Sequence, residues 1–415
     1  MASGKSTHRA EQAALAGKRA SGRWMWLAAL GIAVLYMGST LLTPLYPIYR
    51  REFGFSELVV TGVYAIYVVG NLFVLFLFGR LSDQIGRRRT TLIALAGTVL
   101  SALCFAFAMN AAWLFPARVL SGLGAGLGAG ALTAWIAELE PNQNRARAAM
   151  VASAANLAGL ALGALMAGLL AAHVPWPLRS SYVVYLCLLL ILLAVMRTAP
   201  ETVDEPVRSL GALSLRPRIG IPRAIRLAFV APAAMAFAAF SLGGFYAALL
   251  PGVLAQGLHQ SGPAVIGGVV AAFFATAAVT AGATGRLGSR PSMLIALGLL
   301  WLGLALLLSA EARRSMAWLM IATLVAGAAM ALGYRGSLQI VNRIAPPEQR
   351  AEVVSSYLLV CFIANSLPVI GVGLLSLPLG APHAHRVFAL VLVILASGAC
   401  AVSWRHAAPA GNPGR

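Results

Sequence analysis

Long apolar segments alternate with short polar segments along almost the whole chain. Twelve of the apolar segments are close to the ~20 residues that an α-helix needs to cross a bilayer. They lie at about residues 26–46, 59–78, 91–110, 112–137, 148–172 and 180–196, and then at about 227–250, 264–284, 292–310, 316–340, 352–377 and 386–404. The pattern predicts an all-α polytopic membrane protein with 12 transmembrane helices in two six-helix bundles.

The polar stretch 197–226 divides these helices into two sets of six. It contains four prolines and six arginines, so we expect a cytoplasmic central loop between an N-terminal bundle at 26–196 and a C-terminal bundle at 227–404. Residues 1–25 are basic and rich in Ala, Gly and Ser, which predicts a disordered cytoplasmic tail rather than a signal peptide. Residues 405–415 are expected to form a cytoplasmic C-terminal tail.

Composition and charge agree with a membrane protein. Only 10% of the residues are charged and the mean hydropathy is +0.83, whereas a soluble domain is about 25% charged. The net charge of +19 does not indicate a nucleic-acid partner, because the basic residues are interspersed with spanning segments rather than clustered with aromatics. Of the 31 Lys and Arg residues, 23 fall in predicted cytoplasmic segments and 6 in predicted external ones. This bias predicts that both termini are cytoplasmic.

Two sequence patterns recur at half the chain length. The Gly-Arg-Leu motif at 79–81 returns at 285–287, an offset of 206, and the Pro-x-x-x-Arg-Ala pattern at 141–146 returns at 346–351, an offset of 205. Both halves would begin on the same side of the membrane. We therefore expect an axis along the membrane normal to relate them, with a central site at their interface.

The loop between the second and third apolar segments carries the most specific motif. It reads GRLSDQIGRRRT over residues 79–90 and resembles the pattern G-x-L-x-D-x-x-G-R-[KR]-[KR] of the major facilitator superfamily. The matching positions are Gly79, Leu81, Asp83, Gly86, Arg87, Arg88 and Arg89. Arg118 followed by Gly122, and the run Pro200-Glu201-Thr202, are similar to further signatures of that family.

The resemblance extends from the first predicted helix to the last. It implies a secondary active transporter of the twelve-helix bacterial type, multi-pass in the inner membrane and monomeric, that moves a small-molecule substrate by alternating access. Similarity to bacterial members with short loops favours efflux of a drug or metabolite. Proton-coupled uptake of a carboxylate or other small nutrient is the alternative, and a ligand-binding membrane sensor is a remoter one. An enzyme is not supported, because the sequence has no G-x-S-x-G or H-E-x-x-H motif.

The charged loop residues are candidates for a gate. Gly79 and Gly86 mark a tight turn, and a dehydrated carboxylate at Asp83 would need an arginine or a helix N-terminus as its partner. Our hypothesis is that Asp83, with Arg87 and Arg88, holds the cytoplasmic face closed in one state of alternating access. The alternative is a solvated charge cluster that only sets the topology.

Two arginines lie inside predicted helices, where a charge is costly unless it faces a wet cavity or a partner. Arg118 is in the outer half of the fourth helix and Arg335 is in the inner half of the tenth. Both are candidates for substrate binding or coupling. Snorkelling of the side chain to the headgroups is the alternative for each.

Uncharged polar residues complete the candidate cavity. Those on the first, second and fifth helices are Tyr36, Thr40, Tyr67, Asn71 and Asn156, and further candidates are Thr43, Tyr64, Tyr246, Tyr357 and Asn365. For each of them, helix packing or interfacial anchoring is an equally good interpretation. With two intramembrane arginines and no carboxylate central in a span, we expect a preference for neutral or anionic substrates.

Small residues on the fourth and fifth helices predict close helix packing, at Gly122, Gly126, Gly159, Gly163 and Gly168. The glycines from 122 to 130 have nucleotide-loop spacing but follow no strand, so we reject a phosphate-binding loop. Those of the fifth helix match part of the family's antiporter pattern G-x-x-x-G-P-x-x-G-G. Ala164 replaces its proline and Ala167 one of its glycines, which argues against antiport.

No cofactor and no metal site is expected. The four cysteines fall in apolar runs, as buried thiols do. None of the 12 acidic residues is central in a span, and four of the histidines, His173, His259, His383 and His385, fall in predicted external loops. Protons are nevertheless a candidate coupling ion, carried by Asp83, by Glu138 or by the substrate itself.

Overall fold

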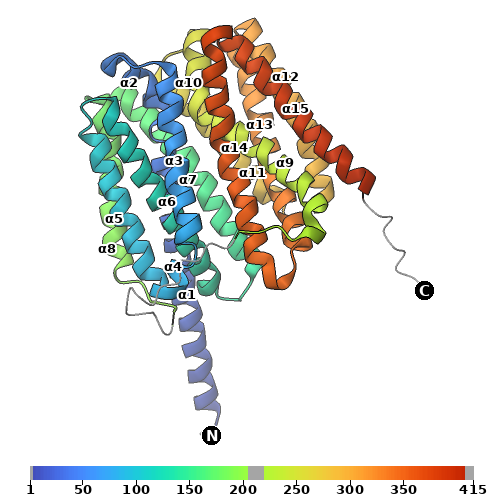
Figure 1. Ribbon diagram of the computed structural model, residues 1–415. Helices are drawn as coiled ribbons and strands as arrows, with labels where there is room; N and C mark the ends of the chain where they lie inside the picture. Colours follow the sequence, from blue (N-terminus) through green and yellow to red (C-terminus); the bar gives the residue numbers. More distant parts are fainter. Residues whose placement is uncertain (1–2, 204–218, 407–415) are drawn as a thin grey trace.

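The computed structural model describes residues 3–203 and 219–406, and these parts are helical without a β-strand. Twelve helical stretches are long and apolar enough to cross a membrane, as the hydropathy pattern predicts. Figure 1 shows them side by side, with the first half of the chain in blue to green and the second half in yellow to red. The two-bundle arrangement follows from the polar segment that separates the sixth helix from the seventh.

The N-terminal bundle contains six spanning segments. The first runs through α1 (Ser3–Thr40), the 3-10 helix η1 (Thr43–Leu45) and α2 (Tyr46–Phe53), and the others are α3 (Glu57–Leu77), α5 (Arg87–Ala106), α6 (Ala111–Leu139), α7 (Arg145–His173) and α8 (Pro177–Met196). The short helix α4 (Leu81–Ile85) lies in the loop between α3 and α5. Buried side chains such as Trp135, Leu95 and Leu189 fill the core of this bundle.

The C-terminal bundle contains the other six. Its first span starts at η3 (Arg223–Ile225) and α9 (Arg226–Gly244) and continues through the π-helical η4 (Phe245–Leu249), α10 (Leu250–Gly252) and the π-helical η5 (Val253–Gly257). The others are α11 (Pro263–Ala283), α12 (Ser289–Arg313), α13 (Met316–Ile344), α14 (Arg350–Leu379), which follows η6 (Pro347–Gln349), and α15 (Ala381–His406). Short π-helical segments often occur at functional positions.

The prediction of a disordered N-terminal tail is wrong for residues 3–25, because α1 begins at Ser3. The segment is rich in Ala and in long polar side chains, which favour helix. Because the segment extends a spanning helix, no new helix nucleus has to form. At the other boundaries, α9 begins at Arg226 and α15 ends at His406. Residues 204–218 of the predicted central loop and 407–415 of the predicted C-terminal tail lie outside the described residues.

Several predicted packing glycines lie at close helix contacts. A β-carbon at Gly159 of α7 would overlap the carbonyl oxygen of Ala33 on α1, and one at Gly163 would overlap that of Met37. On α6, a β-carbon at Gly126 would lie 3.2 Å from Cβ of Val74. These contacts bring α7 and α6 against α1 and α3, and so hold the N-terminal bundle together.

The two bundles meet along α7 with α11 and along α3 with α14. A β-carbon at Gly168 of α7 would lie 2.6 Å from the carbonyl oxygen of Pro263 and 3.0 Å from Cα of Gly267 on α11. Backbone therefore approaches backbone across this boundary, which only small residues allow.

Contacts between the bundles close one end of the molecule. We call the end that carries α2 and α10 the α2 face and the end that carries α4 the α4 face (Figure 1). At the α2 face, Thr43 Oγ1 donates a hydrogen bond to the carbonyl oxygen of Ala247 at 2.8 Å, and Gln256 Nε2 donates to Glu57 Oε2 at 3.3 Å. Close by, Thr61 of α3 packs against Gly373 of α14. The structure is therefore closed at the α2 face.

Gly122 of α6 provides a test of the packing. A β-carbon there would overlap the carbonyl oxygen of Tyr67 and lie 3.2 Å from Cα of Gly70. Gly122→Val is expected to destabilise the protein by about 1–3 kcal/mol or more, because backbone on both sides must move. Thermal unfolding of the purified protein in detergent measures this. Gly130→Val, on the same helix with nothing within 4 Å of its β-carbon position, is the matched control, and equal losses for the two variants would contradict the argument.

Candidate functional site

Arg87, the first residue of α5, is the centre of a charge network at the α4 face. The residue is buried, and its guanidinium forms an ion pair with Asp83, donates to Ser82 Oγ at 2.7 Å and donates to Glu138 Oε1 at 2.8 Å. Asp83 lies on α4, one turn before Arg87, and Glu138 lies in the last turn of α6. One cation is therefore shared by two carboxylates.

Glu201 caps the N-terminus of α5. Its carboxylate accepts hydrogen bonds from the backbone N–H groups of Arg87 at 2.8 Å and Arg88 at 3.2 Å. A carboxylate is favoured there because the first N–H groups of a helix have no helical partner. Gly86 permits the approach, since its φ is +106° and a β-carbon would overlap the Glu201 carboxylate. Arg88 Nη1 in turn donates to the carbonyl oxygen of Ala199 at 3.2 Å.

The structure brings together some of the predicted gate residues but not all. Asp83 has an arginine partner, as the sequence argument expected, and that partner is Arg87, whereas Arg88 binds a backbone carbonyl. Gly79 lies in the turn between α3 and α4. Thr202 completes the network by donating to Glu138. The described partners of the network all belong to the N-terminal bundle or to the segment that follows it, so in this conformation they stabilise one end of that bundle.

Glu140 fixes the adjoining loop at the α4 face. Its carboxylate is buried and accepts hydrogen bonds from the backbone N–H groups of Asn144 at 2.6 Å and Asn142 at 2.8 Å, and from Arg147 at 3.1 Å. The bond from Asn144, followed by those from Asn142 and Arg147, holds the pKa of Glu140 below its ordinary value although burial opposes this. The loop between α6 and α7 is thus held by an ionised side chain.

Arg118 is fully buried inside the N-terminal bundle, with 1% of its surface exposed. Nη1 donates to the carbonyl oxygen of Ser39 at 3.0 Å, Nη2 donates to the Tyr46 hydroxyl at 3.1 Å, and Cζ lies 5.7 Å from the ring centroid of Tyr67. Nε has no hydrogen-bond partner. The snorkelling interpretation is therefore wrong for Arg118. A buried cation held by neutral groups is costly, which marks the position as a candidate for function.

Aromatic and polar side chains from both bundles meet near the middle of the spans. Tyr36 of α1 lies within interaction range of Asn156 of α7, Tyr67 of α3 and Tyr334 of α13. Nearby, the Tyr64 hydroxyl of α3 pairs with Asn365 of α14. We call these residues the central cluster: Tyr36, Tyr64, Tyr67, Asn156, Tyr334 and Asn365. Four of them, Tyr36, Asn156, Tyr334 and Asn365, are only partly covered by the protein, as expected for a site between the bundles.

Other predicted cavity residues are used within the protein. Thr40 Oγ1 donates to the carbonyl oxygen of Leu160 at 2.7 Å, and Asn71 Nδ2 donates to that of Tyr67 at 3.2 Å. Both side chains are buried. Tyr246 is also buried and stacks on Phe273 with 4.1 Å between ring centroids. In this conformation these side chains contact other parts of the protein, as the helix-packing interpretation predicts.

Arg335 binds the loop that follows α11. Its guanidinium donates to the carbonyl oxygens of Thr284, of Gly285 at 2.7 Å and of Leu287 at 3.0 Å. This loop is the second copy of the Gly-Arg-Leu motif. In the described structure Arg335 therefore stabilises the second-half counterpart of the α4 loop, and its guanidinium is directed there rather than toward the central cluster.

Sequence reasoning missed one residue of the site and misplaced a histidine elsewhere in the C-terminal bundle. Tyr334 was overlooked because it stands in an apolar run beside Arg335, although it lies within interaction range of Tyr36 of the other bundle. His385 was assigned to an external loop, but α15 begins at Ala381 and leaves His385 only 5% exposed. The error has a clear cause: the apolar run starts after the helix does.

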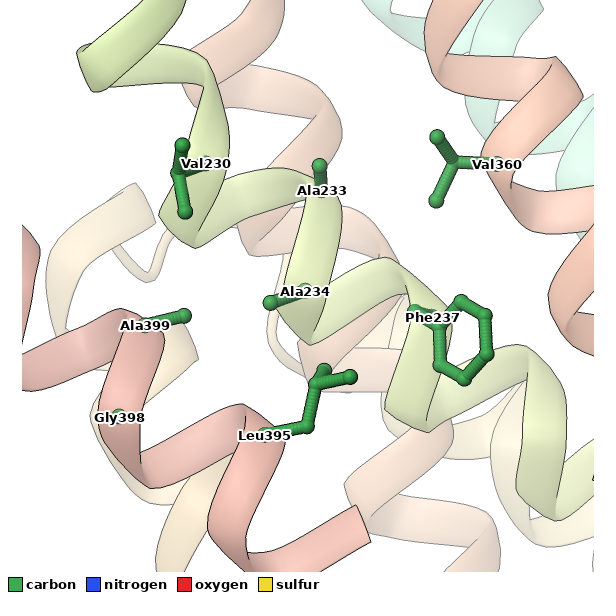
Figure 2. Close-up of a pocket in the computed structure, with 8 residues that line it drawn as sticks. All are labelled: Val230, Ala233, Ala234, Phe237, Val360, Leu395, Gly398 and Ala399. Carbon is green, nitrogen blue, oxygen red and sulfur yellow. The ribbon is translucent and has the colours of Figure 1, made fainter. Parts of the chain in front are cut away.

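A separate apolar pocket of about 430 Å³ lies between α9, α14 and α15. Figure 2 shows its lining, which consists of Val230, Ala233, Ala234, Phe237, Val360, Leu395, Gly398 and Ala399. Val230 is 43% exposed, so the pocket opens on the outer surface of the C-terminal bundle. It has none of the convergent polar groups that fix a substrate's orientation, and the central cluster remains the better candidate.

Comparison with known proteins identifies the kind of molecule. The family model described as Major Facilitator Superfamily matches residues 28–368. The fold is similar to that of a bacterial homologue of the human lysosomal transporter Spinster, solved in an inward-facing and unoccupied conformation, with a TM-score of 0.68 and 14% identity over 93% of this chain and 96% of that one.

Two curated relatives match shorter stretches. The Quinolone resistance protein NorA of Staphylococcus aureus is 26% identical over 140 residues, which are 34% of this chain and 36% of the relative. The Sugar transporter ERD6-like 6 of Arabidopsis thaliana is 30% identical over 113 residues, which are 27% of this chain and 22% of the relative. The matched stretches thus span between about a fifth and about a third of these relatives.

The network around Arg87 predicts a specific loss of stability. Arg87→Gln removes the cation that Asp83 and Glu138 share, and we expect a loss of about 1–3 kcal/mol, since both carboxylates are partly solvated. Arg89→Gln, at an exposed neighbouring position, should stay within about 0.5 kcal/mol of the parent. Thermal unfolding in detergent gives both values. A double variant with Glu138→Gln should recover part of the loss, and strict additivity would show that the pair does not interact.

Proposed function

Since this chain belongs to the major facilitator superfamily and is a membrane transporter of that family, we propose that it exports a small organic solute across a bacterial inner membrane by alternating access. The observation that carries the proposal is the central cluster. Asn156 of α7 and Tyr334 of α13 both lie within interaction range of Tyr36 of α1, so that helices of the two bundles contribute to one region. A site that is shared by both bundles changes its access when the bundles rock.

The chemistry of the cluster favours a neutral or anionic organic substrate. Its residues offer phenol rings for stacking and amide or hydroxyl groups for hydrogen bonds. The Arg118 guanidinium lies beside the Tyr67 ring and has an unused Nε–H. No carboxylate belongs to the cluster, so a cationic substrate would lack a counter-charge.

In the proposed cycle, the two faces open in turn. The α2 face is closed by Thr43 with Ala247 and by Glu57 with Gln256. The α4 face is cytoplasmic in this proposal, on the evidence of the basic residues that it carries, including Arg87 and Arg88. Asp83 is the proposed gate residue: opening of the α2 face would bring the α4 network against the C-terminal bundle. The proposed transporter acts as a monomer.

Export is favoured over uptake by the similarity to a protein named for quinolone resistance. The second candidate is proton-coupled uptake of a small carboxylate. It is favoured by Arg118, a buried guanidinium with a free donor that a substrate carboxylate could accept from. The two candidates differ in direction and not in the site that they use.

Growth assays and direct flux separate these candidates. Expression in a bacterial strain that lacks its own exporters should raise resistance to members of a toxic-compound panel that includes a quinolone, and inverted membrane vesicles should accumulate the same compounds. Normal resistance combined with growth on a new carboxylate as sole carbon source would replace export by uptake. Absence of flux for every compound tested in proteoliposomes would reject both.

Arg118 gives a test of the substrate's charge. Arg118→Gln should lower flux of anionic compounds by about 10-fold to 100-fold, the value of a lost charge-assisted hydrogen bond, and should affect neutral compounds less. Arg179→Gln, at an exposed position, is the control. The variant's elution profile and melting temperature show whether it is folded. An equal reduction for anionic and neutral compounds in a folded variant would contradict a role in charge recognition.

A further inference from the structure

His385 and Glu311 form a buried pair in the C-terminal bundle. His385 Nδ1 lies 2.9 Å from Glu311 Oε1, and the side chains are only 6% and 12% exposed. Glu311 is near the end of α12 and His385 is near the start of α15, so the pair joins two helices at the α2 face. Ionisable side chains within spanning segments are rare, and they often mark ion or proton sites.

Each member of the pair touches a π-helical segment. The ring of Phe245, the first residue of η4, lies edge-on to the His385 ring with 5.3 Å between centroids. Glu311 packs on Gly257, the last residue of η5, where a β-carbon would lie 3.7 Å from Glu311 Cγ. The pair is therefore in contact with both irregular segments of this span.

The same two segments hold the α2 face closed. In η4, two residues after Phe245, the carbonyl oxygen of Ala247 accepts the hydrogen bond from Thr43. In η5, immediately before Gly257, Gln256 donates to Glu57. Both closing hydrogen bonds are thus within two residues of a contact with the His385–Glu311 pair. A movement of the His385 or Glu311 side chain can therefore reach both hydrogen bonds through these direct contacts.

We infer that His385 and Glu311 form a proton-binding site whose protonated state stabilises the conformation closed at the α2 face. The inference rests on the proposed function and adds to it a coupling ion and the position where that ion binds. It also locates proton coupling in the C-terminal bundle, away from Asp83 and Glu138.

The proton balance follows from the geometry. In the proposed site Glu311 is ionised, and because a carboxylate only accepts hydrogen bonds, Nδ1 of His385 then carries the hydrogen between the two side chains. A proton from water at the α2 face is taken up at Nε2, and the buried pair changes from a net charge of −1 to a neutral ion pair. The stronger charge-assisted bond draws α12 and α15 together behind η4 and η5. Release of the proton weakens this support and favours opening.

Few other ionisable side chains lie on the elements that surround the pair. Among the elements packed on α15, α9 with η4 presents Phe245, and α14 has no ionisable side chain after Cys361. On α12 the partner is Glu311 itself. The other charged or titratable groups at this end of α12 and α15 are exposed: Arg313, Arg314, His383 and Arg386.

The test measures opening of the α2 face without any substrate. Thr61, 1% exposed between α3 and Gly373 of α14, is replaced by cysteine in a variant whose four native cysteines are alanine. Ser261→Cys, at an exposed position, corrects for the effect of pH on thiol reactivity. Both variants are labelled with an impermeant maleimide in proteoliposomes, and the labelling ratio is the rate for Thr61→Cys divided by the rate for Ser261→Cys. This ratio should rise about fivefold or more between about pH 5.5 and pH 8.

Variants of the pair decide whether it is the origin of this dependence. His385→Gln and Glu311→Gln should each make the labelling ratio independent of pH, because neither leaves an imidazolium–carboxylate pair. His383→Gln, two residues away and exposed, should keep the dependence of the parent. A labelling ratio that does not depend on pH in the parent would overturn the inference, and so would a pH-dependent labelling ratio in folded His385→Gln. The measurement on the parent tests the inference even if a variant does not fold.

Flux with a quinolone as probe separates this inference from the proposed function. If the quinolone is transported but the labelling ratio does not depend on pH, the proton site is rejected and the proposal of export stands. A pH-dependent ratio without flux of any compound would reject export and leave the proton site. Where both are present, His385→Gln should lose flux driven by a pH gradient and keep substrate counterflow, which needs alternating access but no net proton movement.

Discussion

The lipid bilayer requires each buried charge and polar group to find its partner inside the protein, and the arrangement of this transporter depends on how its arginines meet that requirement. Arg87 is satisfied by carboxylates and Arg335 by backbone carbonyls, both at the α4 face. Arg118 has only a carbonyl, a hydroxyl and an aromatic ring as partners, and its Nε has none. Two of these arginines therefore stabilise loops, and the third, in the outer half of α6, keeps an N–H group without a partner.

The boundary between the bundles combines tight packing with a few hydrogen bonds. Within the N-terminal bundle, glycines such as Gly122 and Gly159 allow tight packing, and α7 with α11 repeats this across the boundary at Gly168 and Gly267. At the α2 face, by contrast, closure relies on hydrogen bonds from Thr43 and Gln256. Individual hydrogen bonds contribute only about 0.5–1.5 kcal/mol each. A ligand or a proton with a modest preference for one conformation can therefore shift the equilibrium.

The solved structure and the curated relatives are similar to this chain in different ways. The solved structure shares the fold over almost the whole chain at 14% identity, which says nothing about the cargo. The curated relatives share short stretches and carry names that point to different cargoes. In our proposal, substrate choice comes from the side chains of the central cluster and Arg118. A common fold does not determine them.

The sequence by itself determined the spans, the division into two bundles and the loop motif, because hydrophobic length and short-range spacing are written locally in the chain. It also predicted that Asp83 would need an arginine or a helix N-terminus as its partner. Only the tertiary structure decided which residues come together: Glu138 and Glu201 reach Arg87 from distant segments, Tyr36 comes within interaction range of Tyr334 of the other bundle, and His385 lies against Glu311. Such pairs depend on how helices rotate and pack against one another, and no local pattern in a single chain records that rotation.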